Sequence, residues 1–395
     1  MNTYNLHTIL MLGQALEEAK IPYQFTDEAA LFIQGVEVAE LVRLSVSVQW
    51  DLFDDAYTLF EPFAPAQREI MPERAFFLFF TEGLEVVVSC DFNTTVKTDP
   101  YRIPVTHGET VLWCSSVYRY LFSPRNQVYN AAIHNFLARQ HRGITTHNEQ
   151  AWNQNNYAAL LKRFGEPAEI AAKIQQNPKW RLHPFYKYIE EAEGKRIVHL
   201  MGSNGVKATA LALLGAKVTV IDFSRENEAY AKDVASQAGV SIDYIVSDIL
   251  SLGEEFLSGN YDIVLMELGV LHYLLDLFPL MEIVKKLLAP GGRFILHEFH
   301  PVSTKLITSA GKKHKVTGNY FDPMIEDHTV AFSKHLPAEE QQVLTRVLQR
   351  KWTIGELITA AGQSGLIIKF LEEEPNHKLH DIGLPKTYTL VAEKP

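Results

Sequence analysis

The chain is poor in cysteine, in basic charge and in long apolar segments, and each shortage argues against one class of protein. Only two of its 395 residues are cysteines, Cys90 and Cys114, which form neither a CxxC pair nor a disulfide framework and suit a reducing cytoplasm. Acidic residues outnumber Lys and Arg by 47 to 37, for a net charge of −10. This balance argues against a nucleic-acid partner, because such affinity comes mainly from phosphate neutralisation. No apolar run could span a bilayer, and the N-terminus is unlike a signal peptide, so we expect a cytoplasmic protein without a membrane partner.

The most informative segment runs from Lys195 to Ser224. An apolar strand leads into a Gly-Ser-Asn-Gly turn, an Ala/Leu-rich helix and a second apolar strand that ends in Asp222. Glycines let the backbone bend sharply and approach a ligand closely, the helix start offers free N–H groups, and the acid can accept both ribose hydroxyls. The segment predicts half of a nucleotide-cofactor site. Dehydrogenases that use NAD and methyltransferases that use S-adenosylmethionine share this unit, so it does not choose between them.

Further landmarks follow in order along the chain. They are a strand ending in Asp248, a strand entered through Tyr261-Asp262, a helix over 277–288, an Ala-Pro-Gly-Gly turn and a fifth strand over 293–298. With these landmarks, roughly residues 195–394 resemble the class I S-adenosylmethionine-dependent methyltransferases. The resemblance implies an α/β, Rossmann-like fold with a seven-stranded sheet whose last pair is antiparallel, S-adenosylmethionine as cofactor, and methyl transfer as the reaction.

The glycine turn departs from the pattern of that family. The positions that usually hold an acid and three glycines hold His199, Met201, Ser203 and Gly205, with an extra glycine at Gly202. The acidic anchor and two of the three glycines are therefore absent. Two interpretations stay open, a cofactor loop with altered contacts to the methionine end and a tight turn that holds no ligand.

The resemblance implies a set of cofactor-binding residues at the strand ends. Asp222 is assigned to the ribose, Phe223 to an adenine face, and Asp248 with Ile249 to the adenine edge and ring. The full cofactor set adds the glycine turn, the residues after the fourth strand and an aromatic lid: Gly202, Ser203, Asn204, Gly205, Ser224, Glu267, Leu268, Gly269, Trp152 and Tyr157.

Histidines gather after the fourth and fifth strands, where the methyl acceptor is expected. His272 and His300 are the candidates for a general base, since a neutral imidazole can take a proton from a hydroxyl, thiol or amine. The alternative is a metal site made with Glu298, but the HEFH spacing places its two histidines on opposite sides of a strand, so no metal is expected. Candidates for substrate contacts are Tyr273, His297 and three residues of an insertion over 301–336, which are His314, Tyr320 and Phe321.

The remaining sequence predicts two further segments. Residues 1–145 read as a small α+β domain that resembles the nucleotidyltransferase-like fold of aminoglycoside- and lincosamide-modifying enzymes. Those enzymes need paired aspartates for magnesium, whereas the corresponding strand here offers Ser45 and Ser47, so we expect a degenerate domain for substrate binding or homodimer formation. Residues 146–193 read as a helical lid or linker, and residues 194–395 as the methyltransferase domain.

These observations predict methyl transfer from S-adenosylmethionine to a small-molecule acceptor. Two other functions stay open. One is an RNA or protein methyltransferase that uses the first 145 residues to bind its substrate, and the other is a protein that binds the cofactor without catalysis.

Overall fold

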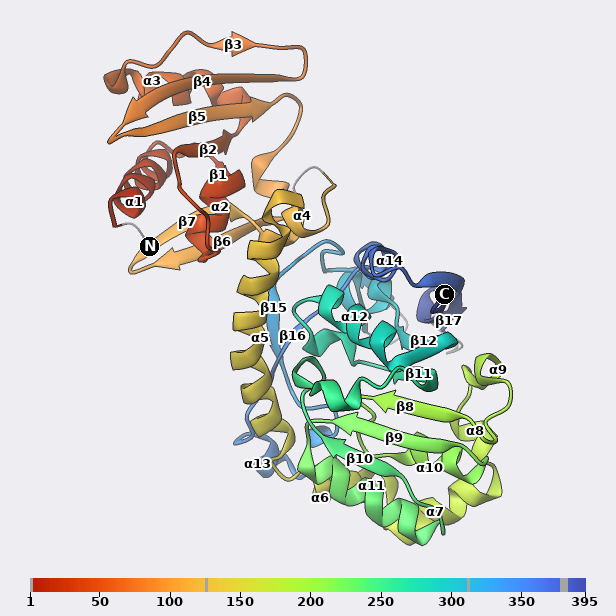
Figure 1. Cartoon of the computed structure of the whole chain (residues 1–395). Helices are drawn as coiled ribbons and strands as arrows, with labels where there is room; N and C mark the ends of the chain where they lie inside the picture. Colours follow the sequence, from red (N-terminus) through yellow and green to blue (C-terminus); the bar gives the residue numbers. More distant parts are fainter. Residues whose placement is uncertain (1–2, 125–126, 311–312, 377–382) are drawn as a thin grey trace. The chain divides into compact units, whose positions relative to one another are not determined.

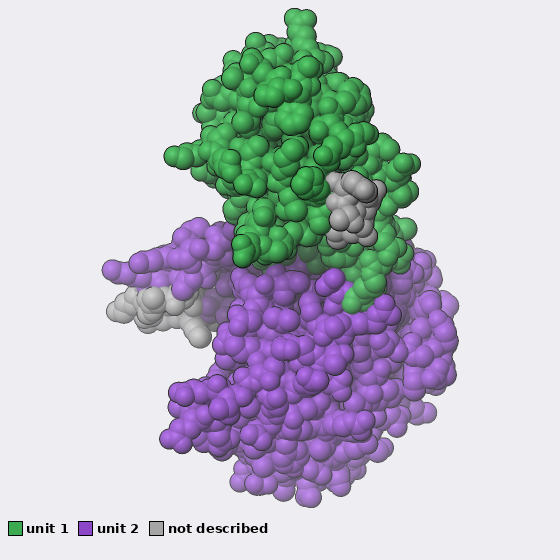
Figure 2. Space-filling view, turned by 90° about the vertical axis from the view of Figure 1, so that its left-hand side faces the viewer, with its two compact units in different colours: residues 1–139, 321–324 green, residues 140–320, 325–395 purple. Residues whose placement is uncertain are grey.

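The chain folds into two compact units. The computed structural model describes residues 3–124, 127–310, 313–376 and 383–395. Unit 1 comprises Met1–Arg139 with Phe321–Met324, and unit 2 comprises Gln140–Tyr320 with Ile325–Pro395 (Figure 2). Within the described ranges, no helix combines the length and apolarity that crossing a membrane requires.

Unit 1 is built on a mixed sheet of seven strands in the order β3-β4-β5-β2-β1-β7-β6 (Figure 1). The strands are β1 Tyr23–Thr26, β2 Arg43–Val48, β3 Glu69–Ile70, β4 Arg74–Thr81, β5 Leu84–Asp91, β6 Arg102–His107 and β7 Thr110–Ser115. The helices are α1 Thr3–Glu18, α2 Asp27–Gln34, α3 Phe53–Leu59 and α4 Val117–Leu121. A tight hairpin at Glu82-Gly83 joins β4 and β5.

The alternating sequence of β2 divides its side chains between two faces of this sheet. Leu44, Val46 and Val48 are buried, whereas Ser45 and Ser47 lie on the other face and are partly exposed. Glu85 pairs with Arg43 across the neighbouring strand. The serines therefore stand on a half-exposed sheet face.

A run of helices links the two sheets along the chain. It consists of α5 Asn130–Trp152, α6 Asn156–Phe164, α7 Pro167–Gln176, α8 Pro178–Arg181 and α9 Tyr186–Ile189. The breaks between these helices fall at glycine and proline residues. Gly165 ends α6 with a φ of 95°, which glycine adopts readily, and Pro167 and Pro178 stand in the first turns of the next helices.

Unit 2 contains the second seven-stranded sheet, in the order β10-β9-β8-β11-β12-β18-β17. The strands are β8 Arg196–Leu200, β9 Lys217–Asp222, β10 Asp243–Val246, β11 Tyr261–Glu267, β12 Leu288–Phe299, β17 Ile367–Pro375 and β18 Pro385–Glu393. The first five run parallel, and β18 is antiparallel to both of its neighbours. This confirms the predicted Rossmann-like fold, preceded by a smaller α+β domain.

Helices cover both faces of this sheet, as its apolar strands require. They are α10 Val206–Leu213, α11 Arg225–Gln237, α12 Leu277–Leu287 and α14 Ile354–Gln363. α10 and α11 pack on each other, as do α12 and α14. Strand residues Ile197, Val220 and Leu265 share one apolar core with α10 and α11.

The segment after β12 adds short strands outside the main sheet. β13 Ile307–Ala310 pairs with β14 Lys313–Val316, and β15 Ile325–His328 pairs with β16 Val347–Arg350. α13 Ala338–Gln341 lies between the latter two in sequence. The β15–β16 pair places part of the insertion beside residues that precede α14.

Candidate active site

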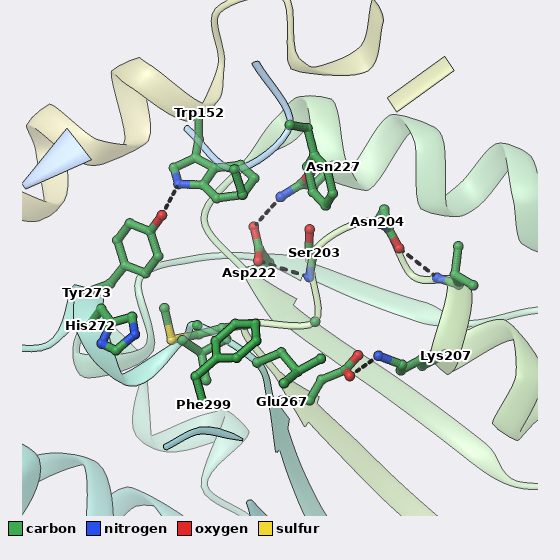
Figure 3. Close-up of a pocket in the computed structure, with 18 of the residues that line it drawn as sticks. Trp152, Ser203, Asn204, Lys207, Asp222, Asn227, Glu267, His272, Tyr273 and Phe299 are labelled. Atoms are coloured by element: carbon green, nitrogen blue, oxygen red, sulfur yellow. Dashed lines mark hydrogen bonds and ion pairs between the residues drawn. The ribbon is translucent and has the colours of Figure 1, made fainter. Parts of the chain in front are cut away.

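A cavity of about 830 Å³ opens where β8, β9 and β11 end at their carboxyl sides (Figure 3). Its walls come from the glycine turn, the strand ends, the helical segment and the insertion. They include Trp152, Phe164, Trp180, Arg181, Gly202, Ser203, Asn204, Lys207, Asp222, Phe223, Glu267, Leu268, Gly269, His272, Tyr273, Phe299, Thr304, His328, Thr329, Phe332, Gln349 and Lys351. In open α/β sheets, ligands bind at this edge.

The glycine turn keeps a glycine-like backbone although two glycines are replaced. Met201, Ser203 and Gly205 have φ angles of 51°, 47° and 66°, so all three positions lie in the left-handed region. Positive φ angles are strained for residues that carry a Cβ. Residues with this strain occur most often at functional sites. Gly202 has a different reason to be glycine, since a Cβ there would lie 2.8 Å from Nδ1 of His199. The turn is therefore tight, and the His199 ring fills the space beneath it.

Asp222 stands at the end of β9 and anchors the turn. Its carboxylate accepts hydrogen bonds from the backbone N–H of Ser203 at 3.1 Å and of Ser224 at 2.9 Å, and from Nδ2 of Asn227 at 3.2 Å (Figure 3). Burial raises the pKa of Asp222, while these hydrogen bonds oppose the shift. The carboxylate is thus fixed in the cavity wall.

A buried charge cluster occupies the wall between the turn and β11. Lys207, in the first turn of α10, forms an ion pair with Glu267 at the end of β11, and Nε2 of His199 lies 3.7 Å from Oε1 of the same glutamate. Burial lowers the pKa of Lys207 to about 8, and burial together with Lys207 lowers that of His199 to about 3. His199 is therefore neutral at pH 7, whereas Lys207 keeps its proton beside Glu267.

A small recess adjoins the main cavity beside Asp248 and Ile249. The α5 residues His141, Thr145 and Asn148 line it, and Nε2 of His141 lies 3.4 Å from Oδ1 of Asp248. Sequence reasoning missed these three residues. With Trp152 they recur every three or four positions, which marks one face of a helix and could have revealed them.

His272 lines the cavity from a 3-10 turn, Leu271–Tyr273, after β11. Its Nδ1 is buried and has no hydrogen-bond partner among the described residues. Burial lowers the pKa of His272, and Lys351, His328 and Lys305 add to this effect, while Glu298 opposes it. His272 is consequently neutral near pH 7.

Glu298 fixes the backbone that leads to His272. This buried side chain accepts hydrogen bonds from the backbone N–H groups of Gly269, Val270 and Leu271. Nε1 of Trp352 donates to the backbone oxygens of Leu271 and Leu274. The turn that presents His272 is thus held at both ends.

Several predicted residues lie in the cavity walls. Trp152 donates from Nε1 to the hydroxyl of Tyr273 at 3.1 Å, and both pack with Phe223 in one apolar cluster (Figure 3). Phe299, Phe332 and Lys351 line the same cavity and were missed, because only the folded chain brings them together.

The two other predicted histidines at the end of β12 lie away from the cavity. Nε2 of His300 contacts Glu373 at 2.7 Å, and its Nδ1 accepts from the Val302 N–H. His297 contacts Thr389 and packs against Phe185, because β12 pairs with β18 through Phe299 and turns these rings into the interior. Neither histidine therefore lines the cavity in which the acceptor is expected.

The remaining predicted residues also serve structure rather than the cavity wall. The hydroxyl of Tyr157 donates a hydrogen bond to Asp233. The side chain of Ser224 caps the N-terminus of α11, and Gly205 directly precedes α10. Tyr320 accepts a hydrogen bond from the Ile354 N–H, His314 lies on β14, and Phe321 groups with unit 1. No cluster of His, Cys, Asp and Glu able to hold a metal occurs in the parts of the chain that the structure describes.

This geometry, a glycine turn, an acid on the second strand and a seven-stranded sheet with one antiparallel strand, defines the class of Rossmann-like methyltransferases. Residues 201–296 match the family model of a methyltransferase domain. The C-terminal half of the chain is a class I S-adenosylmethionine-dependent methyltransferase domain, and the predicted resemblance is confirmed.

Named relatives agree with this assignment over a limited range. The chain is 37% identical over 153 residues to a ubiquinone biosynthesis O-methyltransferase of Methylocella silvestris, covering 36% of this chain and 56% of that protein. It is 29% identical over 146 residues to the enzyme of the same name from Xanthomonas axonopodis, with 36% and 58% covered. The chain thus spans little more than half the length of these relatives.

Solved structures show similarity of the same kind. One is an S-adenosylmethionine-dependent methyltransferase from Mesorhizobium loti, with a TM-score of 0.42, 22% identity, and 52% of this chain and 93% of that chain covered. Another is the magnesium protoporphyrin IX methyltransferase of Synechocystis, with a TM-score of 0.41, 15% identity, and 63% and 99% covered.

Proposed function

We propose that the protein transfers a methyl group from S-adenosylmethionine to a hydroxyl of a small-molecule acceptor, with His272 as the general base. The observation that carries this proposal is one cavity lined by the glycine turn and Asp222 as well as by His272. Pockets for small ligands span about 300–1,000 Å³, and the cavity of about 830 Å³ lies in the upper part of that range. The matched relatives are named O-methyltransferases, which supports oxygen as the methylated atom.

The residues present fit the cofactor. Asp222 has no cationic partner among the described residues, and it can accept the ribose hydroxyls. Glu267 and Lys207 offer opposite charges for the ammonium and carboxylate of the methionine end. Arg181, on α8 next to α10, lines the same cavity, and its Nε is buried without a hydrogen-bond partner in the described residues. These groups can bind the methionine end of the cofactor, where the family's acidic residue is replaced by His199.

The cofactor supplies an electrophilic methyl group and its own leaving group. The protein orients the acceptor, excludes water with its aromatic walls, and moves one proton. His272 is suited to this proton because it lines the cavity and its lowered pKa favours the neutral imidazole. Glu298 positions His272 through the backbone bonds to Gly269, Val270 and Leu271.

The role of unit 1 is a separate proposal. Ser45 and Ser47 cannot replace two metal-binding carboxylates, and Glu85 is held by Arg43. We propose that unit 1 transfers no nucleotide and serves substrate binding or homodimer formation. The free, buried Cys90 and Cys114 suit a protein that works in the cytoplasm.

Two measurements test the proposed function. Calorimetry should detect S-adenosylhomocysteine binding, and a screen with radiolabelled S-adenosylmethionine should find transfer to small hydroxylated compounds rather than to RNA or protein. Binding without any transfer would favour a non-catalytic cofactor-binding protein. Absence of binding would refute the proposal.

A further inference from the structure

The insertion gives the cavity a basic wall. Lys351 directly follows β16 and His328 ends β15, and both line the cavity. Both contact the same carboxylate oxygen of Glu326, Lys351 through Nζ at 2.7 Å and His328 through Nε2 at 3.0 Å. The Lys351 side chain is 21% exposed, whereas that of Glu326 is 47% exposed and does not line the cavity. The cation thus faces the ligand space while its acidic partner faces solvent.

Neutral groups complete this wall. Thr304, Thr329 and Gln349 line it with hydroxyl and amide groups, and Phe299 and Phe332 supply aromatic rings. Cavity walls of this kind, apolar with a few convergent polar groups, bind a flat ring compound and orient its substituents.

The basic groups of this wall also affect the protonation of His272. Lys351, His328 and Lys305 each disfavour a proton on its imidazole. Glu298 opposes this effect at His272, but Lys351 favours negative charge on a group bound directly beside it. The sulfonium of the cofactor adds one more positive charge, so a cationic acceptor would be repelled and an anionic one attracted.

We propose that the acceptor is an anionic, hydroxylated ring compound whose carboxylate or phosphate group binds Lys351 and His328 while its hydroxyl faces His272. This inference rests on the proposed function. The anionic group displaces Glu326 from Lys351, and the ring lies against Phe299 and Phe332. The hydroxyl oxygen bonds to the methyl carbon as its proton passes to the imidazole of His272. The carbon–sulfur bond breaks and its electron pair stays on sulfur, so the products are a methyl ether and S-adenosylhomocysteine.

Matched pairs of probes test this inference on the full chain saturated with S-adenosylhomocysteine. The pairs are 4-hydroxybenzoate with 4-hydroxybenzamide and 3,4-dihydroxybenzoate with its amide, and 4-hydroxyphenyl phosphate is the phosphate arm. Calorimetry should show the anionic member of a pair binding about 10-fold or more tightly, as expected for a charge-assisted hydrogen bond. The benzoate and phosphate arms identify which anion fits.

Three variants separate the role of the charge from that of the fold. Lys351→Gln should remove the anion preference, whereas Glu326→Gln, which removes the competing carboxylate, should increase it. Lys232→Gln is the matched control, because Lys232 also contacts a glutamate, Glu228, at 2.7 Å but lies on α11 outside the cavity wall. The control should retain the wild-type preference.

The outcomes of these measurements are distinct. Equal binding or no binding of both members of every pair, or an unchanged preference in Lys351→Gln, would overturn the inference. Methyl transfer to neutral phenols alone would do so too and leave the proposed function intact. Failure to bind S-adenosylhomocysteine would refute the proposed function itself.

Discussion

The ion pair between Lys207 and Glu267 permits a prediction about both stability and cofactor binding. Burial lowers the pKa of Lys207 from 10.5 to about 8. At about 1.4 kcal/mol per pKa unit, the protonated lysine costs the fold about 3 kcal/mol. The whole cost is present at pH 7, which is below both pKa values, and it is relieved as the pH rises from about 8 towards 10.5. The protonated Lys207 in the cavity wall therefore lowers the free energy of unfolding at pH 7.

Replacing the two residues singly and together separates the two effects. Glu267→Gln alone leaves a buried ammonium without its counter-charge and should destabilise the protein by about 3–5 kcal/mol. Lys207→Met with Glu267→Gln removes both charges, so its stability should equal or exceed that of the wild type by about 1–4 kcal/mol. Affinity for S-adenosylhomocysteine should fall about 10- to 100-fold in the double variant, because the methionine end loses a charged partner.

Denaturant unfolding at pH 7 and calorimetry with S-adenosylhomocysteine measure these quantities. The exposed pair Lys232–Glu228 on α11 is the control, and its double replacement should change stability by less than about 1 kcal/mol and leave affinity unchanged. The reasoning is refuted if the Lys207 and Glu267 double variant binds S-adenosylhomocysteine as well as the wild type, or is less stable than Glu267→Gln.

Further predictions concern the cofactor site, the base and unit 1. Asp222→Asn should weaken S-adenosylhomocysteine binding by about 1–3 kcal/mol in calorimetry, because the ribose hydroxyls lose a charged acceptor. His272→Gln should lower kcat about 10²- to 10⁴-fold without weakening cofactor binding, whereas His300→Gln should change stability but not kcat. His272 works in its neutral form, and burial lowers its pKa below the usual 6.5. The wild-type rate should therefore decrease only when the pH is lowered below 6.5, and a decrease that begins above this value would contradict the assignment. Ser203→Gly should keep cofactor affinity and leave thermal stability unchanged or higher by up to about 1 kcal/mol, since relief of a φ of 47° offsets the flexibility of glycine. Incubation with magnesium and nucleoside triphosphates should release no pyrophosphate; release abolished by Glu85→Gln would overturn the view of unit 1.

The parts of the site that lie close in sequence were predictable. The turn from Gly202 to Gly205 and the acid at Asp222 belong to one strand–helix–strand unit. Their spacing in the sequence therefore predicts that they lie close together in the fold. The seven-stranded sheet was implied by the resemblance to class I methyltransferases, which rests on the order of such landmarks along the chain. Local pattern together with this resemblance was therefore sufficient for the fold of unit 2 and for half of its cavity.

The other half depends on contacts between distant segments. His141 meets Asp248 across 107 residues of sequence, and although helical spacing marks the face of α5 that carries His141, it does not predict that Asp248 lies against this face. His300 turns to Glu373 because of strand pairing with the C-terminal segment. Lys351 enters the cavity wall because β15 and β16 pair, which the sequence of the insertion alone did not indicate.

The backbone of the glycine turn bears on how such proteins can be found. Met201 and Ser203 keep the dihedral angles of the glycines they replace, and Gly202 makes room for the ring of His199. A search for an acid followed by three alternating glycines rejects this chain, whereas a search for three alternating left-handed dihedral angles accepts it. Position 202 is also tied to two neighbours at once: a Cβ there would lie 2.8 Å from both the His199 ring and a Val220 methyl, so a side chain can enter this position only if residues 199 and 220 both change or move.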